Sequence, residues 1–497
     1  MVRAQQFLGR PSTSGSTRVG TASAVTWKLN TSRQSSRLLF PVLAIGAVFQ
    51  AILQTIMVPL LPSMPGLIGV GSAAVSWLVT STLLVGAVVT PIFGRLADMV
   101  GKKRMLLISL TLMTGGSMLC AISSNIAVLI LARGLQGVGA VIIPIGISIL
   151  REELRTGRVP RTIALLNSTL GLGVALGVPF SAAIIQWANW HVLFWVTTAI
   201  GASLTLAAAM VVGESRSRTG GRFDGVGAVG LSSALVCLLV PTTQGSGWGW
   251  TSPAVVSMFV AAAALFVLWG RQQLRNGNPL VDLQSASRRA LLVPHLVALL
   301  VGFAFYGNTL ITTQLLQADP DAGAGYSLSI LLAAVCLLPV SVAMMTFAFV
   351  AARFSDRRGP KASILVGSVF LVCGYALHAV PGKPLWLVVM AIGIAAIGTT
   401  FVYCTLPLLI LAAVPLAQAA AANSVNVLLL STGTAVCSAV IAPILTNQSG
   451  GQVTAAGFAS AYIVCAVCAV VVTMAGSALP KRRRSVAPDV YATSSVV

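Results

Sequence analysis

Two short charged turns repeat one pattern at distant places in the chain. The first, at 94–104, contains Asp98 followed by a glycine and a basic run, and the second, at 352–361, contains Asp356 in the same setting. A carboxylate in such a turn can pair with cations or with the positive end of a helix. A contact of this kind can form in one conformation and break in another. The repeat predicts a protein built from two similar halves.

A single cation, Arg133, falls inside an apolar segment at 126–150. Placing an arginine there costs roughly 2.5–3.5 kcal/mol on insertion scales, so such a residue is rarely kept without a use. Gly134, Gly137 and Gly139 follow it and permit close helix contact. Arg133 is therefore a candidate for a charge-dependent role within the membrane. The alternative is that it only satisfies buried carbonyl groups.

Few other residues in the apolar segments can change charge. None of the ten Asp and Glu residues lies in the middle of a predicted span, and Glu152 and Glu153 lie at the inner end of the fourth. His295 lies in the ninth span, and an ordinary pKa of about 6.5 suits proton exchange, although a lone helical histidine is more often a packing residue. The three histidines are widely separated and show no nucleophile–base spacing. We therefore expect no enzyme activity, no metal and no cofactor.

The elements that hold these residues need a lipid environment. Hydrophobic residues make up 56% of the 497 residues and charged residues only 8%, with a mean hydropathy of +0.92, whereas soluble domains carry about 25% charged residues. The net charge of +21 does not indicate nucleic-acid binding, because the basic residues form short clusters between apolar runs. That distribution is the orientation pattern of a multi-pass membrane protein. The bilayer is the expected surrounding, and no nucleic-acid partner is expected.

Fourteen apolar segments are long enough to span a bilayer, which needs about 20 residues of helix. They lie at 38–62, 73–94, 105–122, 126–150, 162–186, 192–213, 225–243, 252–270, 290–314, 328–351, 362–380, 385–412, 423–446 and 457–479. With this count, every Lys and Arg except Arg133 and Lys383 falls on one side. The positive-inside rule makes that side, with both chain ends, cytoplasmic. The prediction is an all-α polytopic membrane protein with 14 transmembrane helices.

The positions of the charged turns divide these spans into units. One turn follows span 2 and the other follows span 10, so spans 1–6 and 9–14 are predicted to form two six-helix bundles, with spans 7–8 an inserted helix pair. The predicted units are a disordered basic cytoplasmic extension at 1–37, an N-terminal bundle at 38–213, the inserted pair with its linkers at 214–289, a C-terminal bundle at 290–479 and a basic cytoplasmic tail at 480–497. An organelle transit peptide is the alternative for the extension.

The first turn resembles the Gly-x-x-x-Asp-x-x-Gly-basic-basic signature of the major facilitator superfamily, and the resemblance extends over the whole membrane region. It implies a cytoplasmic latch that holds an outward-open state. The latch residues would be Gly94, Arg95, Asp98, Gly101, Lys102, Arg353, Asp356 and Gly359. The second copy departs from the signature at Ala352 and Pro360. The simpler alternative is that these charges only set the topology.

Three other stretches bear on the branch of the superfamily, which resembles the fourteen-helix drug:proton antiporters and exporter-type carriers of actinobacteria. The run from Arg133 to Gln136 is similar to a signature whose arginine is implicated in proton coupling. The coupling candidates are Arg133, Gln136, Glu152 and His295. Gly173, Gly177 and Pro179 resemble the antiporter signature of helix 5, with Val178 interrupting it. The first span has Leu53 where this branch usually has an Asp, so the usual coupling carboxylate is missing.

The resemblance also implies a substrate cavity lined by the first and fourth helices of each half. Polar and aromatic residues on or near them are Gln54, Thr55, Phe303, Tyr306, Asn308, Gln314 and Tyr403. A mostly apolar cavity with a few hydrogen-bonding groups suits small amphiphiles, although Tyr and Gln also join helices. We expect a monomeric secondary active transporter of the cell membrane that exports drugs or other small amphiphilic compounds by proton antiport. The alternative is an uncoupled or dedicated exporter of one endogenous metabolite.

Overall fold

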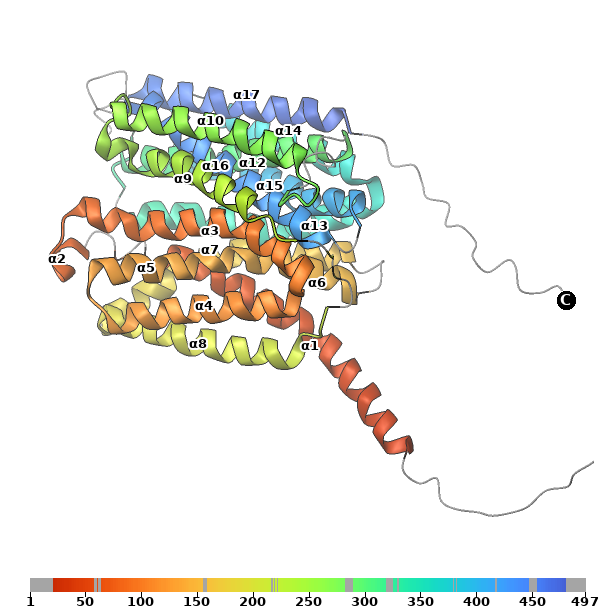
Figure 1. Cartoon of the computed structure of the whole chain (residues 1–497). Coiled ribbons are helices and arrows are strands. Elements are labelled where there is room, and N and C mark those ends of the chain that lie inside the picture. Colours follow the sequence, from red (N-terminus) through yellow and green to blue (C-terminus); the bar gives the residue numbers. More distant parts are fainter. Residues whose placement is uncertain are drawn as a thin grey trace, which may run out of the picture.

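Long apolar runs form helices here because, in hydrocarbon, each backbone polar group must be satisfied within its own segment. The computed structural model describes residues 21–57, 60, 64–154, 159–215, 218, 220, 222–281, 289–318, 325–328, 330–378, 380, 382–415, 418–446 and 454–479, and this part of the chain is all-helical. Its long helices lie side by side in a single bundle (Figure 1). The predicted basic tail at 480–497 and most of the predicted extension lie outside the described residues.

The N-terminal half makes six passes along the bundle. Its elements are α1 (Thr21–Thr55), the short α2 (Met64–Ile68), α3 (Ser72–Val100), α4 (Lys102–Ile122), α5 (Ile126–Gly137), η1 (Val138–Val141), α6 (Ile142–Glu153), α7 (Val159–Trp187) and α8 (Trp190–Val211). Within this half α1 packs on α7, α4 packs on α8, and α5 packs on both α3 and α4.

The C-terminal half repeats this packing. Its elements are α12 (Arg289–Gln317), α13 (Ile330–Arg358), α14 (Pro360–His378), α15 (Leu385–Ala413), α16 (Ala419–Thr446) and α17 (Ala455–Ser477). Here α12 packs on α16, α14 packs on α17, and α15 packs on both α13 and α14. The predicted two bundles of six are therefore present, and α9 (Gly225–Trp248) and α10 (Pro253–Arg275) form the inserted pair between them in sequence.

Thirteen helices within the described residues are long and apolar enough to cross a membrane. The remaining predicted span, 162–186, corresponds to α7, which has 29 residues and contacts both α1 and α13. At about 1.5 Å per residue this length exceeds what a bilayer core requires. The count of fourteen stays a prediction, and the multi-pass helical architecture is confirmed.

Two local features differ from the expectation. Helix α1 begins at Thr21, inside the extension predicted to be disordered, and the segment 21–37 contains no Gly or Pro to stop a helix. The fourth span is not one helix but is broken by the 3₁₀ turn η1 directly after Gly137. The break lies where a Cβ atom on Gly137 would be 2.3 Å from the Thr82 carbonyl oxygen of α3, and one on Gly139 would be 2.6 Å from Met113 Sδ of α4.

The two halves meet along two seams. One joins α3 to α16 and the other joins α7 to α13, so each half contributes its second and fifth passes. Helix α9 lies against both α3 and α16 and covers the first seam. The described start of α1 and the end of α17 lie at the same end of the bundle, on the right in Figure 1.

A buried carboxylate fixes the inserted pair at that end. Asp224 caps α9 by accepting a hydrogen bond from the Gly227 amide at 2.8 Å, and it also accepts one from Gln273 of α10 at 2.6 Å. Burial alone would raise the pKa of Asp224. Hydrogen bonds from Gly227, Gln273, Gln272 and the Leu280 amide outweigh that effect and hold its pKa below the ordinary value.

Candidate functional site

A cavity of about 290 Å³ lies between the two halves. Its walls come from α1, α3, α6, α7, α9, α12, α15 and α16, with one residue from η1. The polar residues that line it are Gln50, Gln54, Thr80, Asn167, Thr242, Thr243, Tyr306, Tyr403, Asn423, Asn426, Ser431, Thr434 and Ser438. The rest of the lining is mainly aliphatic. The cavity is thus an apolar space with many neutral hydrogen-bonding groups.

Four of the lining carboxamides are buried and incompletely bonded. Gln50 Oε1, Asn167 Nδ2, Asn423 Oδ1 and Nδ2, and Asn426 Oδ1 have no hydrogen-bond partner among the described residues. Each of these side chains is at most 4% exposed. Buried polar atoms are normally hydrogen-bonded. These four residues therefore have unused hydrogen-bonding capacity beside the cavity.

The predicted cavity residues divide into two groups. Gln54, Tyr306 and Tyr403 line the cavity, whereas Thr55, Phe303, Asn308 and Gln314 are not part of its lining. Thr55 bonds back to its own helix, and Asn308 donates to the Ile392 carbonyl at 3.3 Å and so joins α12 to α15.

Sequence reasoning missed four lining amides. They are Gln50, Asn167, Asn423 and Asn426. Two of the helices that carry them, α7 and α16, had not been expected to line the cavity. These residues could have been found in the sequence as carboxamides within otherwise apolar helices.

The end of the bundle next to the first charged turn is closed by contacts between the halves. Asp98 is fully buried, and its carboxylate accepts hydrogen bonds from the amides of Ala420 at 3.3 Å and Ala421 at 2.7 Å. These are among the first amides of α16, which have no partner within the helix and carry its positive dipole end. The predicted latch carboxylate therefore caps a helix of the opposite half.

Basic residues extend this closure on the N-terminal side. The buried Lys102 ammonium contacts Glu152 and lies 4.0 Å from the Asp98 carboxylate. Arg151 of α6 donates to the Val414 carbonyl, just after α15, at 3.1 Å. Hydrogen bonds thus connect the end of α3 to the first turn of α16 and the end of α6 to the residue that follows α15.

Close backbone approach makes the Asp98 contact possible. A Cβ atom on Gly94 would collide with the Ser424 side chain and would lie 3.1 Å from the Ala420 carbonyl oxygen. Gly94 and Asp98 are separated by one helical turn, so both face α16. Glycine at this position lets α3 come near enough for its carboxylate to reach the α16 amides.

The second charged turn has the same backbone form and a different setting. Gly101 and Gly359 both have positive φ, 125° and 89°, which favours glycine in each turn. Arg353 and Asp356, however, are exposed. Lys361 donates to the carbonyls of Ser477 and Leu479 at the end of α17, so this turn makes a bond within its own half.

Arg133 is buried at 1% exposure between three elements of the N-terminal half. Its Nε donates to the Leu78 carbonyl of α3 at 3.1 Å, and its Nη1 donates to the Leu53 carbonyl of α1 at 2.9 Å and to Gln136 Oε1 at 2.5 Å. Leu53 lies in the last turn of α1, where carbonyls lack helical partners. The structure thus places the Arg133 guanidinium against the backbone at the position that lacks the usual carboxylate.

The small residues of α7 serve close packing against α1. A Cβ atom on Gly173 would lie 2.5 Å from both Ala51 Cβ and the Val48 carbonyl oxygen, and one on Gly177 would collide with Thr55. The Pro179 side chain lies outside the described part. Gly173 and Gly177 therefore let α1 and α7 meet at backbone distance, as the helix 5 signature implies.

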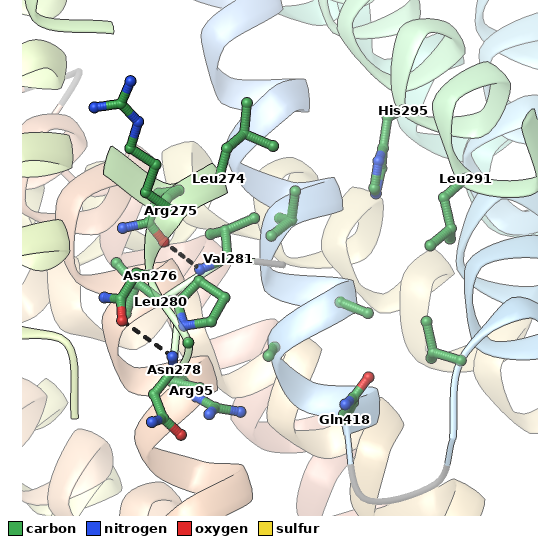
Figure 2. A pocket seen from close by; sticks show the side chains of 17 residues that line it. Arg95, Leu274, Arg275, Asn276, Asn278, Leu280, Val281, Leu291, His295 and Gln418 are labelled. Atoms are coloured by element: carbon green, nitrogen blue, oxygen red, sulfur yellow. Dashed lines mark hydrogen bonds between the residues drawn. The ribbon is translucent and has the colours of Figure 1, made fainter. Parts of the chain in front are cut away.

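A second cavity, of about 490 Å³, adjoins the closed end. Figure 2 shows Arg95 beside Asn278 of the linker 276–281 on one side of this cavity, and His295 and Leu291 on the opposite side. That linker is held by bonds from the Asn278 amide to Asn276 and from the Val281 amide to Gln273, at 3.0 and 3.1 Å. His295 thus lies in this outer cavity and not in the central one.

Comparison with known proteins identifies a family. The model of the Major Facilitator Superfamily matches residues 43–436. A solved structure of the human organic anion transporter MFSD10 (TETRAN) has the same fold, with a TM-score of 0.65 and 16% sequence identity over 88% of this chain and 99% of that one.

Bacterial relatives are similar over much of the chain. The multidrug resistance protein B homolog of Mycobacterium tuberculosis is 28% identical over 353 residues, which are 68% of this chain and 63% of the relative. Multidrug resistance protein Stp of the same species is 28% identical over 393 residues, 78% of this chain and 71% of Stp. The probable actinorhodin transporter of Streptomyces coelicolor is 27% identical over 416 residues, 81% and 71% of the two chains.

Proposed function

Because this chain belongs to the major facilitator superfamily, we propose that it exports small amphiphilic compounds across the cell membrane by alternating access. The observation that carries the proposal is the central cavity between two repeated six-helix halves, closed at one end by the Asp98 contact with α16. A carrier needs a central site and a contact that exists in only one of its two end states. We propose that the central cavity is this site and that the contact between Asp98 and α16 is the one that differs between the two states.

We infer the direction and class of transport from relatives whose names describe multidrug resistance and a probable actinorhodin transporter. We assign the same type of cargo to this chain, namely drugs or drug-like amphiphiles. The basic end of the bundle, with Lys102 and Arg151, would face the cytoplasm by the positive-inside rule. The conformation described is then closed to the cytoplasm, and opening would require the Asp98 bonds to break.

Proton antiport is the coupling we propose, and its candidates lie near the closed end. Glu152 contacts Lys102 beside Asp98, so protonation of either carboxylate would weaken the closure. Arg133 and Gln136 form a buried pair that holds α1 to α3 and α5, and that pair would respond to movement of α1. If His295 takes part in proton coupling as predicted, it would do so from the outer cavity that it lines.

Uncoupled export of a single metabolite is the second candidate. It is favoured by one observation: among the described residues, the lining of the central cavity contains no Asp, Glu, Lys, Arg or His. A substrate and a proton could not compete there for one titrating site. Coupling would have to act through the closure contacts alone.

Transport by inverted membrane vesicles with an imposed pH gradient tests the proposal. We expect a fluorescent amphiphile to accumulate inside the vesicles when the lumen is acidic, and we expect the gradient to collapse faster when substrate is added. Equal accumulation of the amphiphile with and without the pH gradient would support the uncoupled carrier. No accumulation of any compound in a chemically varied panel would overturn the export function itself.

A further inference from the structure

We propose that the central cavity selects uncharged compounds and recognises them through a set of four carboxamides, Gln50, Asn167, Asn423 and Asn426. This inference rests on the proposed export function and adds the chemical class of the cargo. We call these four residues the amide set. They lie on α1, α7 and α16, so they come from both halves of the protein.

The hydrogen-bonding state of the amide set is the first support. Each of its members has at least one oxygen or nitrogen atom without a partner in the described part of the chain, at an exposure of 4% or less. A carboxamide offers both donors and an acceptor. These atoms are inaccessible in the conformation described, so the side chains must turn toward the cavity before they can bond to a guest. A guest with hydroxyl, carbonyl or amide groups would then complete these bonds, which would offset the cost of removing its own polar groups from water.

The absence of ionic groups around the set is the second support. Within the described residues, the titratable side chains that line the cavity are the phenols of Tyr306 and Tyr403. A permanent cation would enter without a counter-ion, and burial of an unpaired charge is far more costly than burial of a bonded neutral group. The buried cation Arg133 is not part of this lining and bonds to Leu53, Leu78 and Gln136.

The arrangement of the set defines what shape of guest fits. Asn423 and Asn426 lie in the first two turns of α16, whereas Gln50 lies near the last turn of α1. Aliphatic and aromatic side chains fill the lining between the polar groups, including Leu83, Phe305 and Leu430. The expected guest is therefore an apolar body with hydrogen-bonding groups on more than one side, so that it can bond to both halves.

The amide set also lies close to the closure. Ala420 and Ala421, whose amides bond to Asp98, precede Asn423 and Asn426 on the same stretch of α16. A guest bonded to these asparagines would therefore be held by the same short segment of helix that carries the contact between the halves.

The test is a binding measurement with three 4-methylcoumarins that differ at position 7. One carries an amino group, one a tert-butyl group and one a trimethylammonium group; the last two have nearly the same shape and differ in charge. Equilibrium binding to the purified full-length protein in lipid nanodiscs is followed by coumarin fluorescence anisotropy. We expect the amino compound to bind best and the trimethylammonium compound to bind at least about tenfold more weakly than its tert-butyl isostere. Equal or tighter binding of the cation would overturn the proposal.

Variants locate the selectivity. Asn423→Leu with Asn426→Leu should weaken binding of the amino compound by about tenfold while leaving the tert-butyl compound nearly unchanged. Asn308→Leu is the matched control, because Asn308 is an equally buried carboxamide with an unpartnered Oδ1 that does not line the cavity. If the control variant lowers binding of the amino compound as much as the double variant does, the assignment to the amide set is wrong.

A charge swap keeps the test informative if the double variant does not fold. Asn426→Asp adds a carboxylate of nearly the same size and should reverse the preference, so that the trimethylammonium compound binds better than its isostere. An unchanged preference would overturn the proposal. Transport of the same compounds in vesicles separates the selectivity from the export function. If neutral and cationic probes are transported equally well, the protein is an exporter and the proposed selectivity is wrong. If binding is selective but no probe is transported, the proposed export function is wrong.

Discussion

The two halves of this protein share the same helix packing but differ in whether the charged side chains near their turns are buried or exposed. In the N-terminal half, Asp98, Lys102 and Arg133 are buried and bonded. In the C-terminal half, Arg353 and Asp356 occupy the matching turn and are exposed. The two copies therefore share the backbone form of the turn, and in the first copy the carboxylate is buried against a helix of the opposite half.

The residue at the start of each turn explains the difference. Gly94 lies against Ser424 and Ala420 of the opposite half, where a Cβ atom would collide. Ala352, at the same place in the second copy, is buried among Phe401 and Cys404 of its own half. The two positions differ by one methyl group: Gly94 makes a contact between the halves, whereas Ala352 packs within its own half. The comparison teaches that a signature locates a turn, whereas the packing of its first residue decides what the turn touches.

Removal of the Arg133 side chain should have the largest effect on transport. Arg133→Ala leaves the Leu53 and Leu78 carbonyls without their donor, and each lost bond at a buried site costs about 1–3 kcal/mol. We expect the efflux rate to fall by more than about tenfold at equal membrane abundance. Arg133→Lys keeps the charge, and its efflux rate should lie between those of the parent protein and the alanine variant. Normal efflux by the alanine variant would show that the buried charge is dispensable.

The matched pair Asp98→Asn and Asp356→Asn compares the two turns directly. Loss of the Asp98 charge removes its interaction with the α16 helix end, and we expect initial efflux to fall by about tenfold. The exposed Asp356 should tolerate the same change with less than about a twofold effect. Initial rates in vesicles, normalised to protein content, are the measurement. Equal losses would mean that the second turn also works as a closure.

Gly94→Ala tests the steric part of the comparison. The added Cβ should force α3 away from α16 and lower efflux by a few-fold, about the effect expected for 1 kcal/mol or less of weakened closure. Adding Ser424→Gly removes the side chain that it would strike and should restore most of the rate. Ala352→Gly is the control in the other half. A failure of Ser424→Gly to rescue would place the cause elsewhere.

Asp224 supplies a buried carboxylate that acts within one unit, so its loss should affect stability and not transport. Asp224→Asn should lower the thermal midpoint by a few degrees, about the effect of one weakened charged hydrogen bond, with efflux unchanged below that temperature. Because the pKa of Asp224 is lower in the folded state, its stabilisation is present above the unfolded pKa of about 3.9 and is lost as pH falls below it. Thermal scans between neutral pH and pH 3 should show this loss only in the parent protein.

Local sequence predicted the helices well because each span must satisfy its own backbone and present an apolar surface to lipid. The breaks were harder to predict. The break after Gly137 lies where Gly137 and Gly139 pack closely on α3 and α4, and these contacts between helices are not visible in the local sequence. The candidate site followed the same division: Gln54, Tyr306 and Tyr403 were found from their helices, and Asn423 was not.

The sequence by itself determined the number of halves, the side on which the basic residues gather and the identity of Asp98 as a special carboxylate. These properties follow from hydropathy, charge and spacing along one segment at a time. Only the tertiary structure decided that Asp98 meets the start of α16, that Asp356 is exposed, and that Asn167 and Asn423 line one cavity. Those outcomes depend on which faces of distant helices approach each other, and that approach is limited by backbone contacts at glycines such as Gly94 that no local pattern specifies.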